Sequence, residues 1–168
     1  MIMDGPPAIA LGLDPSTDDV MTKPPRPVSA QILSLSRLRS LLFHGIVMAT
    51  GTLILLRLGV ANGDFKHATT LSFTVFVLFQ LFGAVNSRSE GRSVFGRHLF
   101  TNRHLWAALG LVLTLQILVV HWRPLQIFFE TTALSLKEWM IATGIASSLL
   151  LLEEIKKGLL SRKTGAAI

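Results

Sequence analysis

The chain has 168 residues, of which 50% are hydrophobic and 15% are charged, and its mean hydropathy is +0.54. Soluble domains carry about 25% charged residues, so this composition favours a membrane protein, and the length excludes a nucleotide-handling domain beside the membrane helices. The net charge of +6 is typical of basic helix ends at a membrane surface, and we expect no nucleic-acid partner. Because the chain has no cysteine, disulfides and thiolate metal sites are excluded.

The first stretch with chemical content is residues 1–13, which we predict to be part of a membrane helix broken at Gly5-Pro6-Pro7. Proline removes backbone donors and thereby frees carbonyl groups. Broken helices in transporters use such carbonyls, together with a nearby carboxylate, to hold a cation near the middle of the bilayer. Asp4 supplies a carboxylate at this point. We therefore predict that Asp4 is a ligand for a hard cation such as Ca²⁺ or Mg²⁺.

This site is incomplete in the sequence. Calcium takes about six to eight oxygen ligands, and one carboxylate with the carbonyls near Pro6 and Pro7 supplies fewer. The missing ligands must come from elsewhere. The chain has no glycine-rich phosphate loop and no HExxH or GxSxG motif, so we predict no catalytic and no cofactor-binding residues.

Residues 14–39 are predicted to be a polar connector on the cytosolic side. Prolines exclude a regular helix through residues 22–28. The prolines of the connector are Pro15, Pro24, Pro25 and Pro27.

Residues 40–168 are predicted to form four transmembrane helices, because a span needs about 20 mainly apolar residues. Asn62-Gly63-Asp64 is a turn signal after the first span, and Ser135 and Glu138 have capping-box spacing before the last. The predicted fold is an all-α membrane protein, in which four transmembrane helices follow a partial, Pro-broken helix. The predicted spans are residues 40–62, 68–87, 104–122 and 139–155.

Small and polar residues inside the spans allow two interpretations each. Gly45 with Ala49, and Gly144 with Ser148, are four apart and either permit close helix approach or reflect ordinary membrane-helix composition. Gln80 is a weak candidate metal ligand, but for Gln80, as for Gln116, we favour an interhelical hydrogen bond. The histidines lack metal-ligand spacing: His44, His67, His98, His104 and His121. His98 and His104, which share one loop, are predicted to lie at the surface, and His121, beside Trp122, at the membrane interface.

The basic residues predict the orientation in the membrane. The connector, the loop at residues 88–103 and the C-terminal tail hold twelve Lys and Arg residues, and the opposite segments hold the remaining four of 16. Positive residues favour the cytosolic side. We therefore expect a multi-pass integral protein of the plasma membrane with a cytosolic C-terminus, in contact with the lipid bilayer.

Several motifs resemble those of a known family. Asp4-Gly5-Pro6-Pro7-Ala8, followed by Ala10-Leu11-Gly12-Leu13-Asp14-Pro15, resembles the sixth membrane helix of type II P-type cation-transporting ATPases, and the nearest pattern is that of the calcium pumps. Other segments are similar, in order, to later parts of the same family: Lys23-Pro24-Pro25-Arg26, Phe79-Gln80-Leu81-Phe82 and Pro124-Leu125-Gln126. The resemblance covers essentially the whole chain. It implies that the four predicted spans are the seventh to tenth helices and that calcium or another divalent cation is the transported ion.

The resemblance also implies what the chain lacks. The family has an Asn ligand one helical turn before the Asp, and the matching residue here is Met1, whose thioether is a poor ligand for a hard cation. Gln80 stands where some calcium pumps carry an acidic ligand and others carry Gln, so we expect no second ion site. The phosphorylated Asp, the nucleotide domain and helices one to five have no counterpart in these residues. The chain alone is therefore expected not to hydrolyse ATP, and its start at a Met in mid-helix would fit a truncated gene or a late start site.

Three functions stay open from the sequence. The first is the C-terminal membrane fragment of a P-type calcium pump, as a remnant or as one half of a split pump whose partner is the N-terminal part. The second is a stand-alone small membrane protein that associates with or regulates a pump. The third is a free channel, which is the weakest because one carboxylate gives no lined pore.

Overall fold

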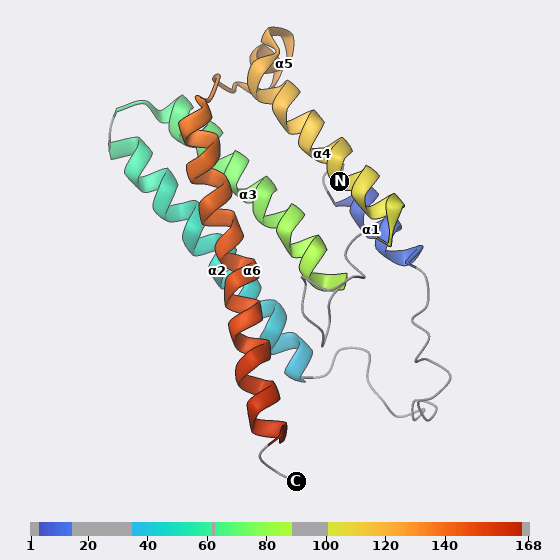
Figure 1. The fold of residues 1–168 in the computed structure, drawn as a ribbon. Helices are drawn as coiled ribbons and strands as arrows, with labels where there is room; N and C mark the ends of the chain where they lie inside the picture. Colours follow the sequence, from blue (N-terminus) through green and yellow to red (C-terminus); the bar gives the residue numbers. More distant parts are fainter. Residues whose placement is uncertain (1–3, 15–34, 62, 89–100, 166–168) are drawn as a thin grey trace.

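The computed structural model describes residues 4–14, 35–61, 63–88 and 101–165, with side chains omitted at Ser36, Arg88 and residues 157–165. Within these ranges the chain forms six helices and no strand (Figure 1). Most of the predicted connector and of the basic loop, with Met1 and His98, lies outside the described residues. The helices are α1 (Gly5–Gly12), α2 (Leu35–Ala61), α3 (Phe65–Arg88), α4 (Arg103–His121), α5 (Arg123–Phe129) and α6 (Leu136–Gly165).

Helices α2 and α3 form a hairpin whose turn agrees with the predicted turn signal. Gly63 has φ +88°, a left-handed conformation that glycine adopts without steric cost. Asp64 follows, and its carboxylate accepts a hydrogen bond of 2.9 Å from the backbone N–H of His67. This bond satisfies one of the free N–H groups at the start of α3.

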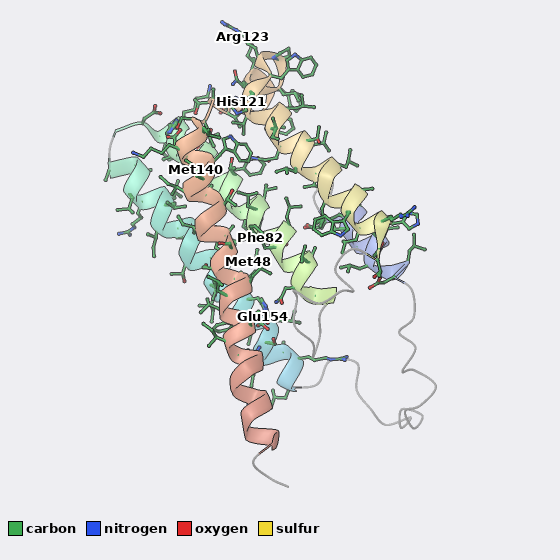
Figure 2. The ribbon with its side chains drawn as sticks, in the orientation of Figure 1. Met48, Phe82, His121, Arg123, Met140 and Glu154 are labelled. Carbon is green, nitrogen blue, oxygen red and sulfur yellow. The ribbon has the colours of Figure 1, made fainter. Side chains whose placement is uncertain are left out.

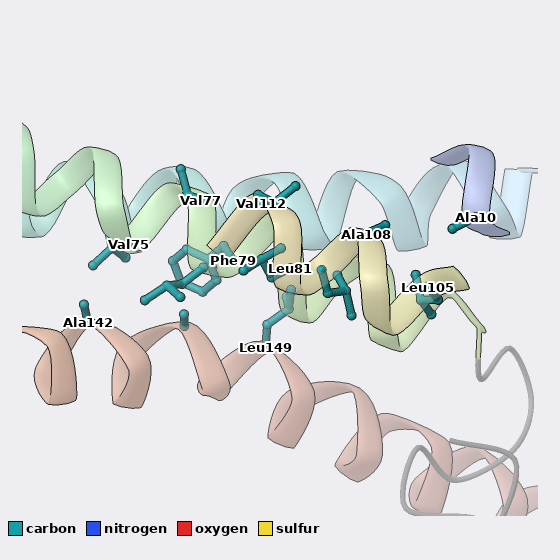
Figure 3. Packing of buried hydrophobic residues seen from close by; sticks show 13 residues of the cluster. Ala10, Val75, Val77, Phe79, Leu81, Leu105, Ala108, Val112, Ala142 and Leu149 are labelled. Atoms are coloured by element: carbon teal, nitrogen blue, oxygen red, sulfur yellow. The ribbon is translucent and has the colours of Figure 1, made fainter. Parts of the chain in front are cut away.

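Helix α3 is the centre of the bundle, since it contacts α1, α2, α4 and α6 (Figure 1). Its residues Val75 and Phe79 are 0% and 1% exposed. On α6, Ala142 and Ala146 are fully buried in the same apolar cluster, as is Leu149 (Figure 3). Small alanines four residues apart allow α6 to lie close to α3.

Of the two interpretations of the small-residue pairs, the described residues favour ordinary membrane-helix composition. A Cβ added at Gly45 or at Gly144 would meet no atom within 4 Å among the described residues. A Cβ at Gly51 would lie 3.0 Å from the Phe79 ring, and one at Gly59 would lie 2.6 Å from the Cβ of Ala68. Only one side of a helix faces a given neighbour. Residues spaced four apart share a side, but their spacing does not indicate whether that side faces a neighbour.

Three described helices are long and apolar enough to cross a membrane: Arg37–Ala61, Phe65–Ser87 and Arg103–His121. They correspond to the first three predicted spans. Helix α2 begins at Leu35, before the predicted start of the first span, so the helix includes residues that we predicted as connector. Helix α6 is not among the helices that are long and apolar enough to cross a membrane. Its uncharged run extends only from Trp139 to Leu152, between Glu138 and Glu153.

Candidate functional site

Asp4 lies at the N-terminal end of α1. The two prolines occupy the first turn of this helix, where the backbone N–H groups have no partner inside the helix and their loss costs little. Within the described residues, the helix starts at the Gly-Pro-Pro sequence. The Asp4 carbonyl accepts the N–H of Ala8 at 3.0 Å, while its side chain is exposed and makes no capping bond. The carboxylate is thus accessible at a fixed point on the bundle.

Helix α1 is attached to the bundle by one face. Pro7 and Ala10 are buried, and Ala10 packs in one cluster with Leu105 and Ala108 of α4 (Figure 3). The opposite face is open, since Ile9 is 68% exposed among the described residues. Helix α1 also contacts α3. The packing of α1 therefore fixes where Asp4 lies relative to α3 and α4.

Asn102 makes the polar contact between α1 and α4. Its side-chain Oδ1 accepts the backbone N–H of Leu105 at 2.9 Å and so caps α4. Its Nδ2 donates to the carbonyl of Ala10 at 2.9 Å and to Oδ1 of Asp14 at 3.1 Å. Our sequence analysis missed this residue. An Asn just before an apolar helix is a capping signal, but no local pattern indicates a contact between residues 92 positions apart.

The two glutamines of the spans differ. Gln116 on α4 is 2% exposed, and its Nε2 donates to Oγ1 of Thr74 on α3 at 3.0 Å, which confirms the predicted interhelical bond. Gln80 is half-buried on α3. In the ranges that the structure describes, no group of three or more His, Asp or Glu side chains could share a metal ion. Asp4 and Gln80 therefore do not form a complete cation site from these residues alone.

A second polar cluster joins α2 and α6 near the C-terminal half of α6. The Glu153 side chain is 8% exposed, with Oε1 3.0 Å from Nε2 of His44 and 3.2 Å from Nζ of Lys156. Lys156 Nζ also donates to Oγ of Ser40 at 2.8 Å. His44 lies in the first predicted span, and α2 and α6 bring it to a buried carboxylate, a contact that its spacing along the chain did not indicate. Lys157, four residues after Glu153 and so on the same side of α6, has a side chain outside the described residues.

A third cluster lies at the opposite end of α6. Glu138 accepts bonds of 2.7 Å from both the N–H and the hydroxyl of Ser135, which confirms the capping box. Its other oxygen lies 2.5 Å from Nε2 of His67, which joins the start of α6 to α3. Burial raises the pKa of Glu138, but the bonds from Ser135 and the nearby His67 outweigh burial and hold that pKa below its ordinary value.

The same end includes a contact between α4 and α6. His121, labelled in Figure 2, accepts a hydrogen bond of 3.2 Å at Nε2 from Nε1 of Trp139, and the two rings stack. Aromatic residues with a polar atom are common at the membrane–water boundary, which fits the predicted interfacial position of His121.

The sequence of the chain decides the family. Residues 1–159 match the family described as "Cation transporting ATPase, C-terminus". The chain belongs to this family of cation-transporting ATPases. Its membrane-spanning helices and its relatives agree with the predicted resemblance to the C-terminal region of a P-type calcium ATPase.

Named relatives of this cation-transporting ATPase region are calcium pumps. The chain is 40% identical over 164 residues to "Calcium-transporting ATPase 1" of Schizosaccharomyces pombe, covering 97% of this chain and 18% of that protein. It is 38% identical to human "Calcium-transporting ATPase type 2C member 1" over 159 residues, covering 94% of this chain and 17% of that protein. It is 39% identical to mouse "Calcium-transporting ATPase type 2C member 2", with the same coverages. The chain thus spans less than a fifth of the length of these relatives.

Proposed function

We propose that this region is the C-terminal transmembrane domain of a pump that transports calcium, and that Asp4 is one of the calcium ligands. The observation that carries this proposal is the exposed Asp4 carboxylate on a Pro-started helix docked against the bundle, in a chain that matches named calcium-transporting ATPases over nearly its whole length. A carboxylate is a suitable ligand for calcium, which binds oxygen donors.

The chain supplies only part of a calcium site in this proposal. Asp4 contributes a carboxylate, and the Gln80 side-chain carbonyl is a second candidate on α3, which α1 contacts. Calcium requires about six to eight oxygens, so the other ligands come from segments of the pump that the longer relatives have beyond this region. The phosphorylation and nucleotide-binding functions also belong to those segments, and we propose that these residues alone do not hydrolyse ATP.

We further propose that α6 is a fourth membrane span. Its uncharged run from Trp139 to Leu152 is about 21 Å long at 1.5 Å per residue, short of the roughly 30 Å hydrocarbon core. Glu153 does not end the span in this proposal, because Lys156 on the same helix offsets its charge and the His44 ring of α2 lies 3.0 Å from its carboxylate. The four spans are then α2, α3, α4 and α6, after a short helix at residues 1–13 and a connector at residues 14–39.

The orientation and compartment follow the charge distribution. With four spans, the connector, the loop at residues 88–103 and the C-terminal tail lie on one side, which we propose is the cytosol. Location in the plasma membrane stays a prediction. It is tested by imaging a fluorescent fusion together with markers of each compartment.

The calcium proposal is tested in a full-length pump, by replacing the matching C-terminal segment of the Schizosaccharomyces pombe relative with residues 1–159. In this chimera, we expect Asp4→Asn to reduce calcium affinity about tenfold or more, since it removes a charged oxygen ligand. The measurement is ATP-dependent ⁴⁵Ca²⁺ uptake into membrane vesicles as a function of free calcium.

The matched control is Glu130→Gln, which removes an exposed carboxylate in the loop after α5. We expect the control to transport calcium like the parent chimera. Unchanged calcium dependence in Asp4→Asn would refute the role of Asp4.

A further inference from the structure

We propose that Asn102 is a positioning residue, which holds the C-terminal end of α1 against α4 and thereby sets the place of Asp4. The positioning of α1 stands on the geometry of this chain. The consequence for calcium rests on the proposed function of Asp4.

The Asn102 side chain is buried and uses both ends of its amide. It is 2% exposed, and its oxygen caps α4 through Leu105 while its nitrogen donates to Ala10 and Asp14 at the end of α1. Backbone carbonyls at the C-terminal end of a helix have no partner inside the helix, and Ala10 is one of them in this short α1. Asn102 therefore satisfies groups at the ends of two helices at once.

Asn102 makes three bonds, one accepted from Leu105 and two donated to Ala10 and Asp14. An ionised Asp would accept the Leu105 N–H but could donate neither of the other two bonds. A Ser hydroxyl can accept, but its single proton serves only one of Ala10 and Asp14. The requirement for one acceptor and a donor with two protons on a short side chain selects Asn.

The Asn102 contact matters because α1 is short. It has 8 residues, and isolated helices of this length are marginal in stability, so its place depends on contacts with the bundle. Among its described residues Pro7 and Ala10 are buried and Leu11 packs against the core, and Asn102 adds the polar contact at the C-terminal end. Asp4 lies about 9 Å from Ala10 along the helix, at 1.5 Å per residue, and a rigid helix transmits a shift at one end to the other. Release of the Asn102 contact would therefore displace Asp4.

The absence of cysteine allows a direct test of docking in the full 168-residue chain. An Ala10→Cys reporter keeps the backbone carbonyl that Asn102 binds, and its thiol is buried when α1 is docked. We expect the reporter to react slowly with a membrane-permeant maleimide. Adding Asn102→Asp to the reporter keeps the cap of α4 but places a second carboxylate beside that of Asp14. We expect the thiol to be labelled about tenfold faster, because a buried hydrogen bond is lost.

Two further variants separate this contact from general damage. Asp14→Ala leaves Asn102 and the α4 cap intact, and we expect an intermediate labelling rate. The exchange Asn102→Asp with Asp14→Asn restores a donor and an acceptor, and we expect the rate to fall back towards that of the reporter alone. Far-ultraviolet circular dichroism of each variant should show unchanged helix content. Equal labelling in all variants, or no recovery in the exchange variant, would overturn the proposal.

Calcium dependence in the pump chimera gives the second readout. We expect Asn102→Asp to raise the calcium concentration for half-maximal uptake by about tenfold with little change in the maximal rate, and the exchange variant to recover. If labelling behaves as expected but Asp4→Asn leaves calcium dependence unchanged, the positioning of α1 stands and the calcium role fails. If Asp4→Asn weakens calcium and Asn102→Asp does not, the calcium role stands and the positioning role fails.

Discussion

Single polar side chains join the helices of this bundle at their ends. Glu153 on α6 lies between His44 and Lys156, and Glu138 at the other end of α6 lies between Ser135 and His67. A buried carboxylate such as that of Glu153 would be costly without partners, and both carboxylates are held by several donors. The polar residues therefore fix how α6 sits against α2 and α3, where apolar packing alone permits sliding.

Glu138 makes the stability of the chain depend on pH. Its pKa in the folded chain is below the ordinary value of 4.5, so it stabilises the fold fully above that value, and the contribution is lost as the pH falls through the lowered pKa. We expect the thermal stability of the parent in detergent to exceed that of Glu138→Gln near neutral pH. The difference should shrink as the pH falls below the ordinary pKa and vanish below the lowered one.

Glu138 lies before Trp139, outside the proposed span, so the acid reaches it directly from water. The Gln variant keeps the shape and an acceptor for Ser135, so the comparison isolates the charge. A stability difference that does not change with pH would contradict this explanation.

Among the elements, the α2–α3 hairpin contains a close approach between two helices. A Cβ at Gly59 would be 2.6 Å from the Cβ of Ala68, a distance that demands a backbone shift, while Gly45 on the same helix faces open space. We expect Gly59→Val to lower the free energy of unfolding by about 1–3 kcal/mol, the usual cost of overpacking. The measurement is denaturant unfolding of the chain in detergent.

Gly45→Val is the matched control, because it makes the same chemical change on the same helix without a clash. We expect Gly45→Val to differ little from the parent. Equal destabilisation by both variants would mean that the lost glycine itself, and not the contact with Ala68, sets the effect.

At the scale of the whole molecule, the helices alternate in direction through the bundle, with α1 and α4 set beside α3 away from α2 (Figure 1). If α6 spans the membrane, its two ends lie on opposite sides. We expect a cysteine at Lys137 and an epitope tag after Ile168 to be accessible from opposite faces of sealed vesicles. An impermeant maleimide probes the cysteine, and protease added to the vesicles probes the tag. Access to both from one face would exclude a fourth span.

The sequence by itself determined the features that depend on neighbouring residues. Long apolar runs indicated membrane helices, Asn62-Gly63-Asp64 indicated the turn, and Ser135 with Glu138 indicated the cap, because each is local chain chemistry. The family resemblance likewise follows from motifs along the chain, and the comparisons confirm it.

Only the tertiary structure decided which faces meet. Asn102 reaches Ala10 across 92 positions, His44 meets Glu153 from another helix, and Gly59 rather than Gly45 touches a neighbour. Such contacts depend on how each helix is rotated about its axis and on which helices are adjacent. An apolar run that is hydrophobic on nearly all sides specifies neither.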